Sequence, residues 1–271
     1  VLILDRLEIS AEGDIRGNLS GDSRLSRLVL RAGGSIDVLS TGGTSLAIGG
    51  LSAGRAAVPG EPDSARTGAI RIRAASPVTL AGPVNSHGGP IALEAGGGVL
   101  ELDDAQIDGG TVSLAARDAI VATADAGVVA TVLDLYTAAG DVGAADGALA
   151  IDLTGAGSML RGSVAGSVYV RELNGDLVLG RVQATGEAVL DTLDGSILGG
   201  RASLRAAEVS LRVSGGGVGA IDAAIDDGDD DESSAGERSD EIERSLQVRA
   251  ETLRVSVESR SGNAARVFNQ Y

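Results

Sequence analysis

Short segments that alternate apolar and polar residues recur along the chain at a fixed spacing. They start 21 residues apart, at Ile70, Ile91, Val112 and Leu133. Their third places are also apolar, namely Ile72, Leu93, Leu114 and Leu135, and the intervening places hold Arg71, Ala92, Ser113 and Asp134. Because side chains alternate between the two faces of a strand, each segment is predicted to be a strand with one face in a core and one in solvent.

Glycine stands two residues before three of these segments, at Gly68, Gly89 and Gly110. Since glycine permits a positive φ, we expect sharp corners at these places. A second extended piece follows within the period, such as Val78 to Leu80 and Val99 to Leu102. No window shows the i, i+3, i+4, i+7 apolar spacing of a helix, so crossover helices are not expected.

Strands that repeat without helices predict a solenoid in which each strand pairs in parallel with its equivalent one turn later, about 4.8 Å away. A single turn of this kind is not stable alone, because its buried aliphatic side chains cannot offset the backbone entropy of ordering it. We therefore predict an all-β parallel β-helix with about 21 residues per turn, and residues 1–271 form a single domain.

Two stretches interrupt the periodic pattern. Residues 52–67 contain Pro59, Gly60 and Pro62 and are predicted to be a loop excursion from the stack. Residues 222–243, from Asp222 to Glu243, hold eleven acids and one arginine, which is −10 of the chain's net charge of −16. Such a segment cannot bury apolar surface, so we expect a mobile acidic excursion.

Composition removes several classes of function. The chain has no cysteine, which excludes disulfides, thiolate metal sites and a cysteine nucleophile, and its single histidine makes zinc chemistry unexpected. A net charge of −16 disfavours nucleic acid as a partner. No run of about 18 uncharged apolar residues occurs, so no membrane-spanning segment is predicted. The start at Val1, without a basic and then apolar leader, indicates either that a targeting signal was removed or that the chain is a piece of a longer polypeptide, and we favour the piece.

Two segments with a Gly-Asp-aliphatic pattern carry a family resemblance. They are Asn174-Gly-Asp-Leu-Val-Leu-Gly-Arg-Val-Gln-Ala-Thr-Gly-Glu-Ala-Val-Leu and Ala139-Gly-Asp-Val-Gly-Ala. These segments resemble the repeats of filamentous-haemagglutinin-like bacterial exoproteins, and the likeness covers most of residues 28 to 271. It implies a right-handed parallel β-helix shaft, export to the cell surface and a role in adhesion. The family's secretion domain carries Asn-Pro motifs, which are absent here, so a shaft fragment fits better than the exported head.

An enzymatic alternative rests on polar residues that resemble pieces of a galacturonan hydrolase. Asp103 and Asp104 are adjacent carboxylates, His87 lies in Ser-His-Gly-Gly, and Arg71-Ile-Arg73 is nearby. Their order is the reverse of the family's, and its Asn-Thr-Asp element is absent. Hydrolysis needs two carboxyls held across one bond, whereas neighbouring strand residues point to opposite faces unless a bend intervenes. We therefore expect a turn aspartate pair and an exposed histidine.

A calcium alternative rests on the acids between Asp226 and Glu232, which could supply oxygen ligands. The tract lacks the Gly-Gly-x-Gly-x-Asp repeats of calcium-filled β-rolls, so a solvated acidic loop is expected instead. Arg73 and Glu94 occupy the same place in successive turns and should form an exposed ion pair that contributes at most about 1 kcal/mol.

The sequence thus predicts a non-catalytic structural segment of a large secreted or cell-surface adhesin-like protein. Its expected partners are neighbouring β-helix segments of the same polypeptide and a host receptor, cell-surface receptor or glycan. No catalytic, cofactor or metal site is assigned. The two alternatives are a carbohydrate-active β-helix enzyme and a calcium-binding surface-layer element.

Overall fold

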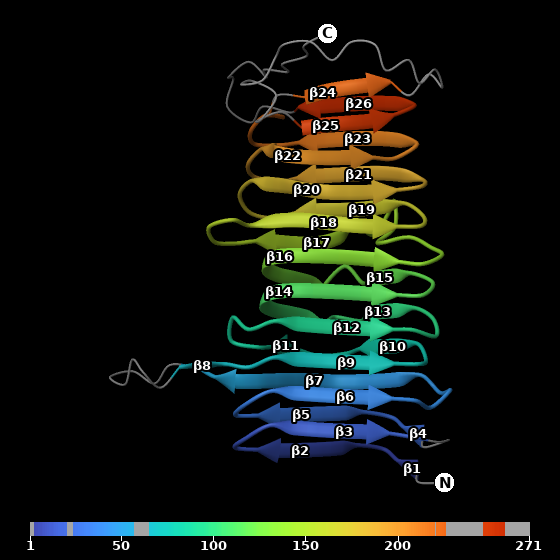
Figure 1. Cartoon of the computed structure of the whole chain (residues 1–271), viewed down its shortest axis with the longest axis vertical. Helices are drawn as coiled ribbons and strands as arrows, with labels where there is room; N and C mark the ends of the chain where they lie inside the picture. Colours follow the sequence, from blue (N-terminus) through green and yellow to red (C-terminus); the bar gives the residue numbers. More distant parts are fainter. Residues whose placement is uncertain (1–2, 21–23, 57–64, 220, 226–245, 258–271) are drawn as a thin grey trace.

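The computed structural model describes residues 3–20, 24–56, 65–219, 221–225 and 246–257. This part of the chain is all-β, and its parallel strands stack as a β-solenoid of about nine turns, roughly 21 residues apart (Figure 1). The predicted fold class is therefore confirmed. None of these residues forms a helix, and so none forms an apolar helix that could cross a membrane.

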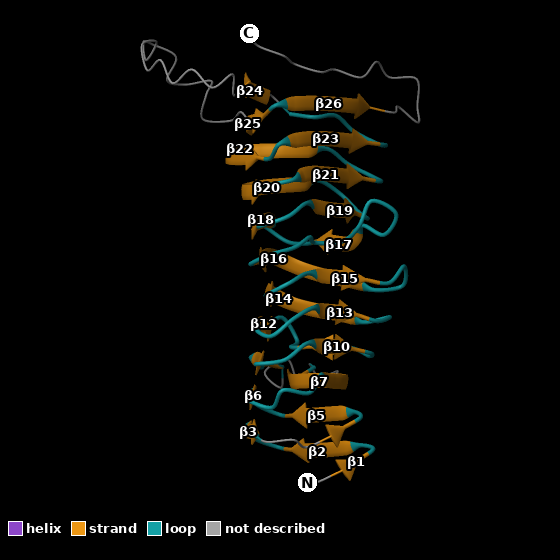
Figure 2. Cartoon of the chain, turned by 90° about the vertical axis from the view of Figure 1, so that its right-hand side faces the viewer, coloured by secondary structure: helices purple, strands orange, loops and turns teal. Residues whose placement is uncertain are grey.

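Two ladders of strands run the length of the solenoid on opposite sides, as Figure 2 shows. The first, here sheet I, contains β3 (Ile15–Leu19), β6 (Ile36–Ser40), β9 (Ile70–Ala74), β12 (Ile91–Ala95), the second halves of β14 (Gln106–Ala116) and β16 (Gly127–Thr137), β18 (Met159–Val164), β20 (Leu177–Ala184), β22 (Ile197–Arg205), β25 (Leu246–Ala250) and β24 (Ile221–Ile225). The second, sheet II, contains β2 (Leu7–Ala11), β5 (Leu28–Ala32), β7 (Leu46–Arg55), β11 (Val84–Asn85), the first halves of β14 and β16, β17 (Leu149–Leu153), β19 (Val168–Glu172), β21 (Glu187–Thr192), β23 (Glu208–Val213) and β26 (Thr252–Val257).

A third, short ladder closes the cross-section only in the middle turns. It joins the start of β7 to β10 (Val78–Leu80), β13 (Leu100–Leu102) and β15 (Ile120–Ala122). Isolated bridges at Val142 then lead this ladder into the start of β19. Two small pairs lie outside the main ladders, β1 (Ile3–Leu4) with β4 (Arg24–Leu25) and β7 with β8 (Arg66–Thr67).

The register in the middle turns follows the predicted period. Ile91 is paired with Ile70 on one side and with Val112 on the other, and Val112 is paired with Leu133. The third-place residues Ile72, Leu93, Leu114 and Leu135 form one inward ladder and are at most 3% exposed. The predicted inside and outside of these strands are therefore confirmed.

Glycine recurs before the strands of sheet I for a different physical reason from the one that the sequence suggested. Gly68, Gly89 and Gly110 are not among the residues with positive φ in the described part of the chain. Instead, a Cβ at Gly89 would overlap the carbonyl oxygen of Gly68, and a Cβ at Gly110 would overlap that of Gly88. These positions require glycine because the backbones of successive turns touch there, so the expectation of positive φ was wrong.

A relay of hydrogen bonds joins successive turns at one kind of corner. An aspartate Oδ1 accepts the backbone N–H of a serine one turn later, and that serine's Oγ accepts a backbone N–H from the turn after it. The relay occurs three times, as Asp14–Ser35–Ala69, Asp141–Ser167–Glu187 and Asp176–Ser196–Gly217. All three aspartates lie in a Gly-Asp-aliphatic motif, so the motif satisfies N–H groups at corners where the ladder is interrupted.

The structure describes only part of the two interruptions predicted from sequence. Of residues 52–67, Ser52 to Arg55 continue β7, and Arg66–Thr67 pair back on it as the antiparallel strand β8. Residues 57–64 lie outside the described residues. Of residues 222–243, Asp222 to Ile225 belong to β24, and 226–243 lie outside the described part, so the predicted mobility is not addressed.

Chain order and spatial order differ at the C-terminal end. β22 is paired with β25, and β25 is paired on its other side with the earlier strand β24. β25 therefore lies between two strands that precede it in the sequence. The chain leaves the place next to β22 open, forms β24 one place further along the stack, and then returns as β25 to occupy the open place (Figure 1).

Candidate functional site

A groove of about 650 Å³ runs along the edge of sheet I where its strands end, and it spans five turns. Each turn contributes the same three consecutive positions. The outward position forms a ladder in register, Tyr136, Ser163, Gln183, Arg205 and Arg249. The inward position and the corner position complete the lining with Thr137, Val164, Ala184, Ala206, Ala250, Ala138, Ala165, Thr185, Ala207 and Glu251.

The floor of the groove is made of small side chains over a backbone that is already hydrogen bonded. The amide of Ala207 donates to the carbonyl of Gly186 at 2.9 Å, and the amide of Glu251 donates to the carbonyl of Ala207 at 3.0 Å. Thr185 Oγ1 donates to the carbonyl of Ala165 in the turn below. Recognition in this groove therefore depends on the outward side chains.

The outward ladder changes character along its length. Tyr136 is 52% exposed and begins the ladder, Ser163 and Gln183 follow as neutral polar groups, and Arg205 and Arg249 end it. This order places an aromatic face at one end and two exposed guanidinium groups at the other. The arrangement can stack an apolar face, exchange hydrogen bonds with hydroxyls and bind carboxylates.

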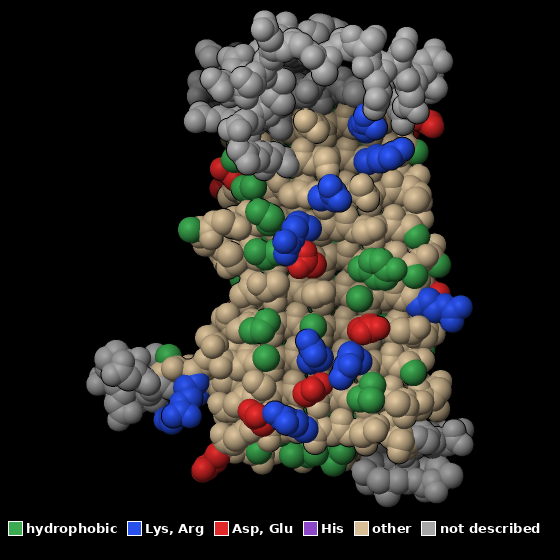
Figure 3. Space-filling view, viewed as in Figure 1, with side chains coloured by type: hydrophobic (Ala, Val, Ile, Leu, Met, Phe, Trp, Pro, Cys, Tyr) green, Lys and Arg blue, Asp and Glu red, His purple; other side chains and the backbone are tan. Residues whose placement is uncertain are grey.

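Charged side chains also lie beside the ladder. Two residues before the ladder positions, on the same outward face of sheet I, Arg161 forms a bidentate ion pair with Asp134, at 2.7 and 2.9 Å. Arg181 lies one turn further on. Figure 3 shows arginine side chains distributed over this face of the solenoid. On the sheet II side of the corner, β21 and β23 begin with Glu187 and Glu208. Arg161 is neutralised by Asp134, while Glu187 accepts a hydrogen bond from Tyr169 and Glu208 pairs with Arg254, so both rims of the groove carry paired charges.

A buried carboxylate lies inside the solenoid, away from the groove lining. Glu172 is 0% exposed at the end of β19, and both of its carboxylate oxygens accept the backbone N–H of Leu153, at 3.1 and 3.3 Å. Burial raises the pKa of Glu172 to about 7, and the hydrogen bonds from Leu153 and Asn174 act in the opposite direction. Sequence reasoning missed it, although the alternation Val168, Val170, Glu172 places a carboxylate at an inward position.

The residues of the enzymatic alternative lie at different corners. Asp103 and Asp104 form the corner between β13 and β14, where Asp104 has φ of 55° and its side chain is hydrogen bonded to Thr123 at 2.9 Å. His87 lies at the corner between β11 and β12 and has φ of 51°. Its backbone N–H donates to Asn85 Oδ1 at 2.7 Å. No described hydrogen bond or ion pair joins these residues to each other or to Arg71.

The predicted neighbours Arg73 and Glu94 are in register, as expected. The ion pair that Arg73 forms is with Asp37 of the preceding turn instead, at 3.7 Å. Among the described residues, no group of three or more histidine, aspartate or glutamate side chains is placed to hold a metal ion. The acids between Asp226 and Glu232 lie outside those residues.

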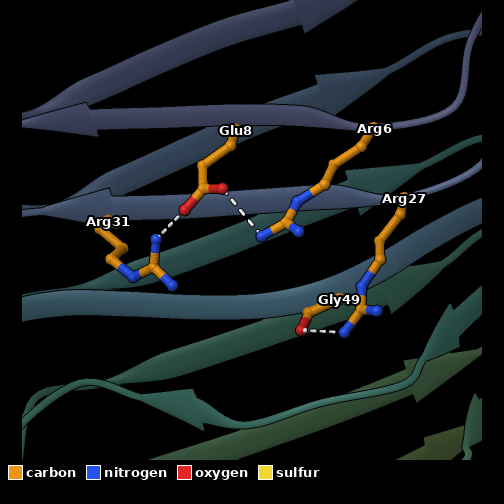
Figure 4. Close-up of polar contacts among 5 residues, drawn as sticks. All are labelled: Arg6, Glu8, Arg27, Arg31 and Gly49. Carbon is orange, nitrogen blue, oxygen red and sulfur yellow. Dashed lines mark hydrogen bonds and ion pairs between the residues drawn. The ribbon is translucent and has the colours of Figure 1, made fainter.

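A second charged cluster lies at the N-terminal end and satisfies itself. Figure 4 shows Glu8 between Arg6 and Arg31, with Arg27 donating to the carbonyl of Gly49. The hydrogen bond from Arg31, followed by the charge of Arg6, lowers the pKa of Glu8. The groove, whose lining recurs over five turns, is the stronger candidate site.

The chain was compared with known proteins at three levels. No family model matches it, no curated protein matches it, and no solved structure matches it.

Proposed function

We propose that this chain is a non-catalytic structural segment of a large secreted or cell-surface adhesin-like protein, in which it acts as a rigid shaft. The observation that carries the proposal is the continuity of sheets I and II, since neighbouring turns are hydrogen bonded in parallel register from β2 and β3 to β25 and β26. In such a stack each turn contacts only its neighbours, so the molecule extends along one axis and each turn fixes the place of the next.

The likeness of the Gly-Asp segments to exoprotein repeats supports placing the shaft at a bacterial cell surface. The relays at Asp141 and Asp176 give that motif a physical reason, because the carboxylate holds the next turn in place. A repeat of this kind extends a stack by adding turns. This property suits a spacer that holds a binding region away from a cell.

Rigidity is tested by measuring one long distance. The chain has no cysteine, so cysteines introduced at Arg16 of β3 and Gln247 of β25 can be spin-labelled without background. Nine strand spacings separate these strands in sheet I, which predicts a single narrow distance distribution at about 43 Å. A broad distribution, or one centred at a much shorter distance, would contradict a rigid shaft.

Location is tested separately by brief protease treatment of intact cells that express the parent protein. Peptides from this chain should be released while a cytoplasmic control protein stays intact. Release only after lysis would contradict surface display.

Catalysis is tested with acidic and neutral polysaccharides. The purified chain should release no reducing ends, and the Asp104→Asn variant should behave identically. Turnover that is lost in Asp104→Asn would replace the shaft proposal with the hydrolase alternative.

A further inference from the structure

We infer that the groove along sheet I binds a sparsely charged acidic polysaccharide, laid parallel to the solenoid axis, with its carboxylates toward Arg205 and Arg249. A shaft does not require such a groove, so this inference goes beyond the proposed function and can fail while the shaft function stands. The residues that carry it are those of the outward ladder, together with Glu251 at the end of the groove.

The shape of the groove favours an extended chain over a small compact ligand. Its lining repeats the same three positions in five consecutive turns, so equivalent side chains recur at the spacing of hydrogen-bonded strands, about 4.8 Å. The floor consists of alanine and threonine side chains at the corners, Ala138, Ala165, Thr185 and Ala207. A long polymer can lie along this low floor and contact every turn.

The ladder chemistry favours a saccharide. Tyr136 offers an exposed aromatic face for the apolar side of a sugar ring, while Ser163 and Gln183 exchange hydrogen bonds with hydroxyl groups. Arg205 and Arg249 supply planar donors that match a carboxylate. Hydroxyls, apolar ring faces and carboxylates occur together in polysaccharides that contain uronic acids.

Glu251 and the net charge of the chain limit how densely the ligand can be charged. Glu251 lies in the groove itself, and Glu187 and Glu208 begin the strands on its far side. Glu251 accepts hydrogen bonds from sugar hydroxyls but repels closely spaced anions, whereas Glu187 and Glu208 already have partners in Tyr169 and Arg254. With a net charge of −16 over the whole chain, a nucleic acid or a densely sulfated glycan is disfavoured.

The test measures binding of the intact chain to four polymers by titration calorimetry at low ionic strength. Hyaluronan oligosaccharides carry one carboxylate per disaccharide and are the expected ligand, dextran is the neutral comparison, and heparin and single-stranded DNA are the densely charged comparisons. Hyaluronan should bind most tightly. No binding to hyaluronan, equal binding to dextran, or tighter binding to heparin or DNA would each overturn the inference.

Two groove variants and a matched control locate the binding. The double variant Arg205→Gln/Arg249→Gln should weaken hyaluronan binding by about tenfold or more, because arginines in binding surfaces carry a large share of the affinity. Arg71→Gln/Arg117→Gln removes the same charge from exposed positions outside the groove and should leave the affinity within about twofold. Equal losses in the two double variants would show a general charge effect and overturn the assignment.

Tyr136→Ala provides an independent measurement, because it changes no charge. It should weaken binding by about fivefold to tenfold. All variants replace exposed side chains, and their melting curves should match that of the parent chain. Unchanged affinity in Tyr136→Ala, with normal melting, would contradict a ligand that runs the length of the ladder.

Discussion

The middle turns and the C-terminal end of the solenoid use the same ladder in different ways. In the middle turns each strand is paired with the strand one period away, as Ile91 is with Ile70 and Val112, 21 residues on either side. At the C-terminal end, Leu204 is paired with Val248, which is 44 residues later, and β24 lies beyond β25. A parallel ladder requires aligned apolar positions, but it does not require neighbouring strands to be consecutive in the chain.

The two regions also differ in the kind of polar group that the interior buries. The middle turns bury neutral hydroxyls, such as those of Ser86 and Thr137, which donate to backbone carbonyls. Toward the C-terminal end, β19 and β21 place the carboxylate of Glu172 in register with Thr192 inside the solenoid. Thr192 donates to the carbonyl of Gly175, and Glu172 accepts from Leu153. The interior therefore accepts polar groups where a corner leaves backbone groups for them to bind.

The largest expected effect comes from breaking the aliphatic ladder of the middle turns. Leu93→Asp buries an unpaired charge between Ile72 and Leu114 and should lower the free energy of unfolding by about 5 kcal/mol or prevent folding. Ala92→Asp, on the outward face, should change it by less than about 1 kcal/mol. Equal shifts in the melting temperatures of the two variants would contradict the assigned inside and outside.

The next effect is a dependence of stability on pH, which the buried carboxylate of Glu172 should cause and the aliphatic ladder should not. The pKa of Glu172 lies near 7 in the folded chain, above its usual 4.5, so unfolding releases a proton between these values and stability falls as pH rises from about 4.5 to about 7. The loss is roughly 3 kcal/mol by pH 8. Glu172→Gln should remove this fall, which makes the variant more stable than the parent at pH 8 and similar to it at pH 4.5.

Urea unfolding at both pH values measures this difference. Glu94→Gln serves as the matched control, because Glu94 is exposed on β12 and should follow the parent at both pH values. A Glu172→Gln profile parallel to that of the parent would contradict the shifted ionisation.

A smaller effect tests the close approach of backbones at the corners. Gly89→Ala should cost about 2 kcal/mol, since the new methyl group overlaps the carbonyl oxygen of Gly68 and forces the turns apart. Gly43→Ala has nothing within 4 Å of the new Cβ and should be nearly neutral. Thermal melting of both variants provides the comparison. Similar melting temperatures would mean that the turns are not in backbone contact.

The smallest effect is expected where the chain departs from sequential order. Replacing residues 226–243 with about ten glycine and serine residues keeps β24 and β25 and leaves enough chain to join them. Stability should change by less than about 1 kcal/mol, because closure entropy depends weakly on loop length. Deleting residues 222–243 also removes most of β24 and exposes the edge of β25, so this deletion should lower the free energy of unfolding by more than the replacement does.

Melting with and without millimolar calcium completes that experiment. We expect no calcium-dependent rise in the melting temperature of the parent chain. A rise that disappears in the 226–243 replacement would instead assign a structural ion site to the acidic segment. Loss of cooperative folding in the replacement would make the segment a true turn of the stack.

The sequence by itself determined the strand pairing of the middle turns. The 21-residue spacing and the alternation around Ile72 and Leu93 specify both the neighbours and the buried face, because every side chain in a parallel ladder lies over its equivalent one turn away. The absence of helical spacing likewise predicted the all-β class. These features are local and periodic, so a single sequence contains them.

Tertiary structure alone decided the features that depend on contacts between positions without a fixed separation. The insertion of β25 between β22 and β24 is one such feature, because the intervening segment removes the period. The groove is another, since Tyr136 and Arg249 share a ladder only after register shifts in β18 and β20 are taken up. The glycine corners are a third, because residue identity does not distinguish positive φ from close backbone contact.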